Sequence, residues 1–571
     1  MSELQMRFAQ IDPSAKQDIV NIVASPMKSW AVINDLRYDN LPLPSDHVNL
    51  THNFWSLTGT KKEFPNDTAG KTWGFVSEAY SGADAKFSPE VLPTIDITFD
   101  ANHKSRGLTL YFYPHTNDYP RFTQVTWYDL NNAVLRSGIY EFNTVVAEIN
   151  EVVASYRRIK IEFLETNLPY RYVQMYAIDF GIIRVLVDAE ISVCTLYEEI
   201  DPTVETISVN TMNANIRTRE SIFSPITSGS FEDMMMTRQP LTIRRDGELF
   251  GVFFLEKWRD PFQSGTAFDL EAGDAVSVLD MYSFDGGLYT DKLITELLDE
   301  LFGIVFPTGI IKYELDPDFQ NSRVTGWIPL GTCGYAFQLI MFALNAIADT
   351  SRRDFIWIYP LDTEPEYYIP LFARDPITGK PDGQYLKGSD EPTDYYSGVD
   401  VFSYSYSLGT EVRSIFDDEL QAGTHKLTFR EPMHSLSITG GTIVQAHVNF
   451  AIVNVSIYGK VTLSGIAYVE NVLTHSVREP EMPAGEIEKI KDFEGYTLVS
   501  HDVGLSIAQS QYEYLQKRIR SENNIVLHDK EVGYIATIQT RGKNVEGIIT
   551  SLDINLRANK ATVVTVGDVK G

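Results

Sequence analysis

A single hairpin places the strongest constraint on how this chain can fold. The stretch LTIRRDGELFGVFFLEKW, from Leu241 to Trp258, holds an Asp246-Gly247 pair between two runs of strand-forming residues. Such a pair predicts a two-residue β-turn, because that turn needs positive φ angles and Gly adopts them without strain. The first arm alternates apolar and polar residues, as a strand that lies on one core should. The second arm is apolar on both faces.

In that second arm, one side carries Phe250, Val252 and Phe254, and the other carries Leu249, Phe253 and Leu255. A sheet with one face in water would leave one of these sets exposed, and exposed apolar area usually marks an interface. We therefore expect Phe250, Phe253, Leu255 and Trp258 to lie at an interface between subunits. The alternative is that helices of the same chain, at Leu293–Phe302 or Tyr335–Ala348, cover the outer face.

Composition limits the class of protein. The 571 residues suggest about four domains, and 43% hydrophobic residues are enough for a packed core throughout. Aromatic residues make up 12%, which favours β-rich structure. The two cysteines, Cys194 and Cys333, cannot form a disulfide framework. The first residues show no signal peptide, and the most apolar segment, CGYAFQLIMFALNAIA, is too short to span a bilayer. We expect a soluble protein made in the cytoplasm, with no membrane partner.

The charge is strongly acidic, with 77 acidic against 48 basic residues and a net charge of −29. Affinity for nucleic acid comes largely from Lys and Arg that neutralise phosphates, so sequence-specific nucleic-acid binding is not expected. An acidic surface fits simple solubility, and it also fits a wall past which DNA slides without sticking.

Short strand patterns separated by turns dominate the chain and predict a mainly β protein with minor α; residues 29–200 read as a β-sandwich. Apolar spacing predicts helices at 293–302, 335–348 and 505–521, and more weakly at 144–156. Thr290 is the expected N-cap of the first of these, and Gly303 is placed to end it. Residues 360–398 are rich in Pro, Gly and Asp, which indicates irregular loops with short edge strands.

No motif for catalysis, a cofactor or a metal emerges. H-E-x-x-H and the phosphate-binding glycine loop are absent. GLSIA, at Gly504–Ala508, lacks the second glycine of a nucleophile elbow, so Ser506 is expected in the first turn of a helix. With so many acids, chance carboxylate pairs are expected, and none can be assigned to glycoside hydrolysis. We predict no catalytic, cofactor-binding or metal-binding residues.

Aromatic residues in the N-terminal sandwich suggest a second kind of site. A ring face stacks on the apolar face of a pyranose while polar neighbours bind its hydroxyls. Tyr80 and Tyr128 could serve in this way, and the residues predicted to contact a glycan are Trp73, Tyr119 and Trp127. The alternative is that Trp127 and its neighbours fill the core.

Three stretches carry a resemblance to a known family. RQPLTIRRDGELFGVFFLEKWRD with FDLEAGDAVSVLDMYSFDGGLY resembles the first barrel of the baseplate hub protein of phage tails and related contractile particles. GWIPLGTCGYAFQLIMFALNAIADTSRRDFIWIYPL is similar to the segment that follows that barrel. EVGYIATIQTRGKNVEGIITSLDINLRANKATVVTVG resembles the closing strands of the second barrel. Together they cover about Glu205 to Gly571. The N-terminal ITFDANHKSRGLTLYFYP and FTQVTWYD resemble a galactose-binding-like jelly roll.

The resemblance implies an N-terminal jelly-roll sandwich followed by two hub-type β-barrels with an intervening α/β segment. The expected parts are a polar, weakly helical leader at 1–28, the jelly roll at 29–200, the first barrel at 205–285, an α+β segment at 286–400, and the second barrel with one helix at 401–571.

The same resemblance implies a non-enzymatic homotrimer in the virion tail or baseplate, assembled in the bacterial cytoplasm. Three protomers with two barrels each would join a sixfold tail tube to a threefold central spike and line the channel. The implied partners are the tail tube protein, the central spike, distal tail or baseplate proteins, and a tape-measure protein. A host surface glycan is a further implied partner of the N-terminal domain.

Two alternatives come from other classes of protein. One is a cell-wall glycan hydrolase with an appended carbohydrate-binding module. The other is a free-standing carbohydrate-binding protein.

Overall fold

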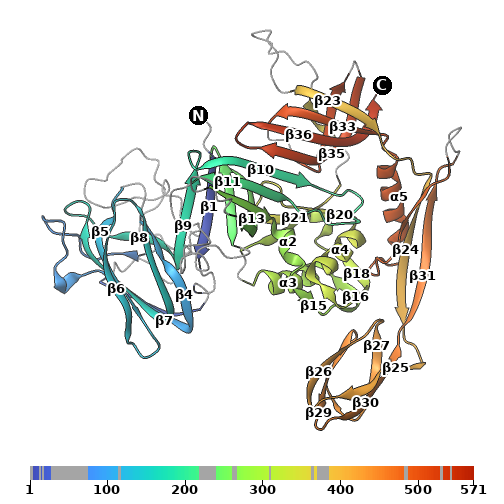
Figure 1. The fold of residues 1–571 in the computed structure, drawn as a ribbon, viewed down its shortest axis with the longest axis horizontal. Coiled ribbons are helices and arrows are strands. Elements are labelled where there is room, and N and C mark those ends of the chain that lie inside the picture. Colours follow the sequence, from blue (N-terminus) through green and yellow to red (C-terminus); the bar gives the residue numbers. More distant parts are fainter. Residues whose placement is uncertain are drawn as a thin grey trace. The chain divides into compact units, whose positions relative to one another are not determined.

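A computed structural model describes residues 4–11, 15, 18–26, 75–112, 117–217, 239–259, 267–307, 310–361, 365–369, 385–480, 487–527, 531–540 and 543–570. Strands dominate it and helices are few, so the expectation of a mainly β protein is confirmed (Figure 1). The chain divides into two compact units. The N-terminal unit comprises Arg7–Leu186 and Ile222–Pro240, and the C-terminal unit comprises Met1–Met6, Val187–Ser221 and Leu241–Gly571. Two strands, β1 (Leu4–Ile11) and β9 (Gly181–Val187), contain points where the chain passes between units.

The N-terminal unit is built on a seven-stranded sheet of order β3-β8-β4-β7-β5-β6, with β2 paired to β4. Its longest strands, β4 and β7, pair along both of their halves, at Ile97↔Ile159 and at Leu110↔Ala147, with irregular register between. The sheet encloses one core to which both halves contribute. The strands are β2 (Ile19–Ser25), β3 (Phe75–Val76), β4 (Thr94–Phe112), β5 (Pro120–Tyr128), β6 (Val134–Glu141), β7 (Val146–Thr166) and β8 (Gln174–Asp179). A short 3-10 turn lies at Pro89–Val91.

Two predictions in this unit are wrong. Residues 144–156 were expected to be helical, but from Val146 onward they belong to β7. Ala147, Ile149 and Val153 are buried while Glu148 and Asn150 are exposed, which is the alternation of a strand. The leader was expected to be weakly helical, and its described part contains β1 and β2 instead. In both places cross-strand pairing outweighs local helix preference. The jelly-roll topology remains a prediction.

The C-terminal unit is organised by one long sheet, in which the strands run β23-β33-β36-β35-β10-β11-β14-β13-β12. Asp246 and Gly247 form the expected turn between β12 and β13, with φ angles of 52° and 87°. At one side, β34 pairs with β35 and with β22. The strands are β10 (Ile191–Glu199), β11 (Thr211–Arg217), β12 (Pro240–Arg245), β13 (Glu248–Arg259), β14 (Ala267–Gly273), β22 (Pro365–Ile369), β23 (Tyr385–Pro392), β33 (Ile519–Val526), β34 (Ile535–Thr540), β35 (Lys543–Asn555) and β36 (Lys560–Lys570).

The intervening α/β segment holds α2 (Ala275–Leu279), α3 (Ile294–Val305) and α4 (Cys333–Leu344). Its strands are β15 (Ser283–Phe284), β16 (Gly287–Leu293), β17 (Lys312–Leu315), β18 (Arg323–Ile328), β19 (Gly331–Thr332), β20 (Ala346–Asp349) and β21 (Phe355–Pro360), and a 3-10 turn lies at Pro317–Phe319.

The helices predicted at 293–302 and 335–348 exist, but their ends differ. The first begins after Leu293, because Thr290 still belongs to β16, so Thr290 is not its N-cap, and it continues past Gly303. The second starts earlier because the Thr332 hydroxyl accepts a hydrogen bond from the Tyr335 amide. It stops at Leu344, since Asn345 takes a left-handed conformation, and the chain continues as β20.

The predicted second barrel contains a separate module, which we call the inserted module (Val412–Ala467). It has two three-stranded sheets around a small core of its own. The strands β24 (Gly398–Ser407) and β31 (Val469–Arg478) lead into and out of it as an antiparallel pair, and β32 (Ile490–Phe493) pairs with β24. Its strands are β25 (Val412–Leu420), β26 (Gly423–Thr428), β27 (Met433–Thr439), β28 (Thr442–Ala446), β29 (Phe450–Val455) and β30 (Gly459–Ala467). The helix predicted at 505–521 is α5 (Gly504–Leu515), and Ile519 already begins β33.

One buried amide attaches the inserted module to the α/β segment. The Asn449 amide nitrogen donates to the carbonyls of Asp285 and Ile328 at 2.7 and 2.9 Å, and its oxygen accepts from the Trp327 indole at 2.7 Å. The Lys426 ammonium lies 2.8 Å from the Asp285 carboxylate. Gly286 must be glycine here, because it has a φ of 66° and a Cβ would lie 2.2 Å from the Ile328 carbonyl oxygen.

Candidate assembly face

The long sheet of the C-terminal unit joins strands from the two predicted barrels. Strand β10 lies just before the predicted first barrel, within the range predicted for the jelly roll, and it pairs with β35 of the second barrel, with Thr195 opposite Asn555 and Tyr197 opposite Asp553. On its other side, β10 pairs with β11, and β11 with β14. Hydrogen bonds between strands therefore run without interruption from one strand set to the other.

One face of this sheet is polar and open to solvent. Because side chains of paired residues point to the same face, the register places these residues together. We call them the polar sheet face: Thr195, Tyr197, Glu199, Asn213, Glu271 and Asp553. The opposite face holds Leu196, Met212, Leu270 and Ile554, all buried. The strands alternate as expected of a sheet with one face on a core.

The charges on this face are partly offset by neighbours on β13. The Lys257 ammonium lies 3.3 Å from the Glu271 carboxylate, and the Arg259 guanidinium lies 3.1 Å from Asp269. Such exposed pairs contribute little to stability. Because each pair is neutral as a whole, Lys257 and Arg259 add no net positive charge to this part of the sheet.

A buried ionic cluster lies on the core side of the same sheet. The Glu198 side chain on β10 is 1% exposed, and its Oε1 lies 3.6 Å from Arg352 Nε. Burial raises the pKa of Glu198 to about 7; Arg352 opposes this rise, while Asp349 and Glu531 add to it. Arg353 bridges the last two, with nitrogen–oxygen distances of 2.9 Å to Asp349 and 2.7 Å to Glu531.

A second buried carboxylate connects the first strand set to the α/β segment. Asp274 caps α2 by accepting from the amides of Val276 and Ser277. Its other oxygen accepts from the Thr350 hydroxyl at 2.5 Å and from the Asn210 amide at 3.0 Å. Burial raises the pKa of Asp274 to about 6 although these hydrogen bonds lower it.

The Glu198 carboxyl should make stability depend on pH. Its pKa in the folded chain, about 7, lies above its ordinary value of 4.5, so the folded chain holds this proton more tightly than the unfolded chain does. Protonated Glu198 contributes roughly 3 kcal/mol to the free energy of unfolding. This contribution is fully present below pH 4.5 and is lost as the pH rises through 7. We expect urea denaturation between pH 5 and 8 to show a smaller pH dependence for Glu198→Gln than for the native chain. Glu199→Gln, its exposed neighbour, is the control; an equal change in both variants would contradict the assignment.

The four predicted interface residues are mostly buried within the chain. Phe250, Phe253 and Leu255 are 6%, 2% and 0% exposed, and Trp258 is half-buried. The Arg352 guanidinium lies over the Phe250 ring at 5.2 Å. On β13, Phe254 contacts Phe306, which directly follows α3, and α2 packs against β13 and β14. Elements of the same chain therefore bury these three side chains, with α2 and the residue after α3 among the elements that contact β13. The interface role stays a prediction, and Trp258 is the residue of the four that is exposed enough to test it directly.

The three predicted glycan contacts do not form one exposed site. Trp73 lies outside the described residues. Trp127 is 0% exposed and packs edge-to-face against Tyr140, so its ring has no face available to a sugar and fills the core. Tyr119 is half-buried against that core. Instead, Tyr80 lies beside Tyr170 and Tyr172, which were not predicted; their signal in the sequence is the alternating tyrosine pair in PYRYV.

The segment considered for a nucleophile has a structural role. Ser506 lies in the first turn of α5 and donates to the Val503 carbonyl. His501 is hydrogen-bonded to the buried hydroxyl of Ser403, which also contacts His475. Within the described residues, no three His, Cys, Asp or Glu side chains are grouped so that they could hold a metal ion. No helix in the described part of the chain is long and apolar enough to cross a membrane.

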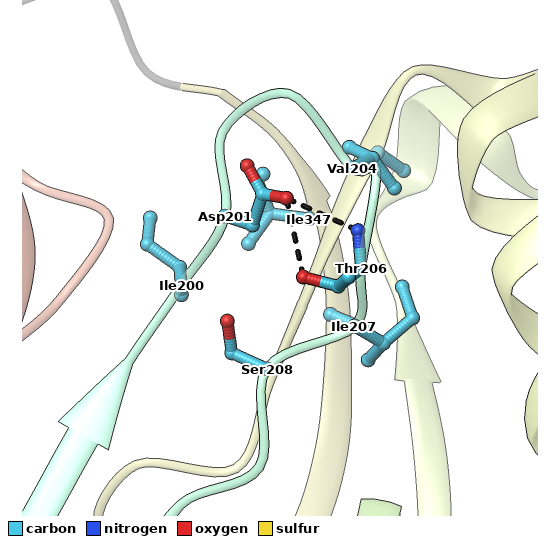
Figure 2. A pocket seen from close by; sticks show the side chains of 9 residues that line it. Ile200, Asp201, Val204, Thr206, Ile207, Ser208 and Ile347 are labelled. Carbon is cyan, nitrogen blue, oxygen red and sulfur yellow. Dashed lines mark hydrogen bonds between the residues drawn. The ribbon is translucent and has the colours of Figure 1, made fainter.

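A small pocket lies between the loop after β10 and strand β20 (Figure 2). Its wall is largely apolar, with Ile200, Val204 and Ile347 among the lining residues. The Asp201 carboxylate accepts hydrogen bonds from the Thr206 amide and hydroxyl at 3.1 and 3.3 Å, and also from Thr203. These bonds shape the loop and satisfy the only carboxylate of the lining.

Comparison with known proteins returns phage tail proteins. No protein-family model matches the sequence, and no curated protein matches it. Among solved structures, the chain is similar to the 43 kDa tail protein of prophage MuSo2 from Shewanella oneidensis, with 9% identity and a TM-score of 0.41 over 67% of this chain and 95% of that one. It is similar to a tail protein from Neisseria meningitidis, with 9% identity and a TM-score of 0.40 over 66% and 96%. An Escherichia coli component of the type VI secretion system shows 8% identity and a TM-score of 0.32 over 66% and 73%.

Proposed function

We propose that this chain is a structural component of a phage tail or related particle: a baseplate hub that forms a homotrimer, joins a sixfold tail tube to a threefold central spike, and lines the channel. The observation that carries the proposal is the pairing of β10 with β35, which puts two sets of strands into one sheet. Three such chains around an axis present six strand sets to a tube and three whole chains to a spike. A change of symmetry of this kind needs no chemistry.

The polar sheet face is the surface we assign to the channel. It carries hydroxyl, amide and carboxylate groups, and the chain as a whole has a net charge of −29. A polyanion that passes such a wall gains little from counterion release, so it is not held there. A tape-measure protein would move through the same channel, along the same polar sheet face. We also propose that the chain contacts distal tail or baseplate proteins and that it is located in the virion tail.

The proposal predicts the oligomeric state. Light scattering on the purified chain should give the mass of a trimer, alone or after addition of the tail tube or spike protein. A chain that stays monomeric at every concentration and with both partners would contradict it. Clearing of bacterial cell walls in a zymogram would favour the glycan hydrolase instead.

A second role concerns the N-terminal unit, which we propose contacts a glycan of the host surface or a neighbouring tail protein. The observation that favours it is the group of tyrosines around Tyr80, two of which are exposed. This role is independent of the trimer, because the residues involved belong to the other unit of the chain.

A further inference from the structure

Three tyrosines from two segments of the N-terminal unit meet at its surface. Tyr80 lies in the loop after β3, and Tyr170 and Tyr172 lie between β7 and β8. The Tyr80 ring is 5.8 Å from that of Tyr172 at an interplanar angle of 90°, and 6.2 Å from that of Tyr170 at 62°. Tyr80 is 56% exposed and Tyr170 is 44% exposed. We call these three residues the tyrosine cluster.

The two segments under the cluster are joined by buried hydrogen bonds. The Ser77 amide donates to the Val173 carbonyl at 3.0 Å, and the Val173 amide donates to the Ser77 hydroxyl at 3.0 Å. Ser81 and Arg171 exchange a similar pair at 2.9 and 3.1 Å. Both serine side chains are buried. Since these bonds lie directly beside Tyr80, Tyr170 and Tyr172, the rings are held on a rigid base.

Arg171, the charged residue between Tyr170 and Tyr172, is paired. Arg171 Nε donates to the Asp118 carboxylate at 2.9 Å, and both side chains are largely buried. A third segment is tied in because the Tyr119 carbonyl accepts from the Asn167 amide at 2.9 Å. The exposed surface of the cluster is therefore aromatic and phenolic, with no net charge of its own.

This surface matches the chemistry of a neutral sugar. A pyranose offers an apolar face to stack on one ring and hydroxyls at its edge, and a second ring at a steep angle presents its polar tip to that edge. A rigid site loses little conformational entropy when it binds. The three tyrosine side chains offer no charge to a basic or acidic partner, so aromatic stacking is the contact that this surface provides.

We propose that the tyrosine cluster is a binding site for neutral saccharides, with Tyr80 and Tyr170 as the stacking surfaces. The inference rests on the second role proposed above, since it names the site and the ligand class for the N-terminal unit. It assigns no part to Trp127, whose ring is enclosed in the core.

The test uses the full chain and a panel of neutral saccharides: galactose, glucose, N-acetylglucosamine and their short oligomers. Binding is measured on an array and then by calorimetry with each sugar that binds. Tyr80→Ala and Tyr170→Ala should each raise the dissociation constant about tenfold or more, as loss of an aromatic contact at the centre of a site does. Tyr80→Phe should keep most of the affinity, because the stacking face remains.

The matched control is Tyr458→Ala, a tyrosine of the inserted module that is 53% exposed and should leave sugar binding unchanged. The proposal is overturned if the full chain binds none of the panel, or if both alanine variants bind as tightly as the native chain. Loss of tail assembly with sugar binding intact in those variants would also overturn it and assign the cluster to a protein partner. Light scattering on the same variants tests the trimer separately, so failure of one proposal is distinguishable from failure of the other.

Discussion

Phe253→Glu and Phe250→Glu should each prevent the C-terminal unit from folding. Both rings are buried, and they occupy opposite faces of β13. A carboxylate at either position would have to enter an apolar interior without a partner, or pull the strand out of its sheet. We expect a loss of more than about 4 kcal/mol in the free energy of unfolding, which is exceptional for one substitution. Urea denaturation followed by circular dichroism, together with the yield of soluble protein, measures it.

Trp258→Glu on the same strand is the control, because Trp258 is half-buried and lies near the strand end. That variant should remain folded. If light scattering then shows less trimer than for the native chain, Trp258 lies at a contact between subunits. If Phe253→Glu instead gave a folded monomer, that side of β13 would face another subunit, and cover by the chain's own elements would be the wrong explanation.

Trp127→Ala should destabilise the N-terminal unit by about 3–5 kcal/mol, the usual range when a large buried aromatic side chain is removed. The indole is completely enclosed by the core of the seven-stranded sheet. Alanine would leave a cavity that strands β4, β5 and β7 can close only in part, because they are hydrogen-bonded to each other. Thermal and urea denaturation of the full chain should show an earlier transition for this unit.

Tyr80→Ala provides the comparison within the same unit. Its ring is more than half exposed, so we expect a change within about 0.5–1 kcal/mol. A Trp127→Ala variant of native stability that had lost sugar binding would contradict the core assignment and return Trp127 to the glycan site.

Several features of the fold follow from local sequence alone. The Asp246-Gly247 turn was predictable because few other residue pairs tolerate two positive φ angles. The helices α3 and α4 were predictable from repeated apolar spacing over several turns. The ends of these helices were harder to predict. The start of α3 depends on β16, which pairs with β18 up to Leu293, and the end of α4 depends on Asn345, which turns the chain into the next strand.

Other features could not be read in this way. The helix α2 spans only Ala275–Leu279, too short to show a helical period, although it is one of the elements that cover β13. The stretch in β7 resembled a helix because Glu, Ala and Val occur there together, and its pairing with β4 decides the outcome. The inserted module has the same short strands as its surroundings, so its separate core was not visible.

By itself, the sequence determined the mainly β class, the hairpin turn, the approximate helix positions and the acidic charge, because each depends on residues within a few positions of one another or on a sum over the chain. Only the tertiary structure decided which surfaces are covered. It enclosed both faces of β13 and the ring of Trp127, buried Glu198 beside Arg352, and brought Tyr80 to Tyr170 from a distant segment. Burial and contact arise from pairing between strands far apart in the chain, and the local pattern around any one residue does not contain that information.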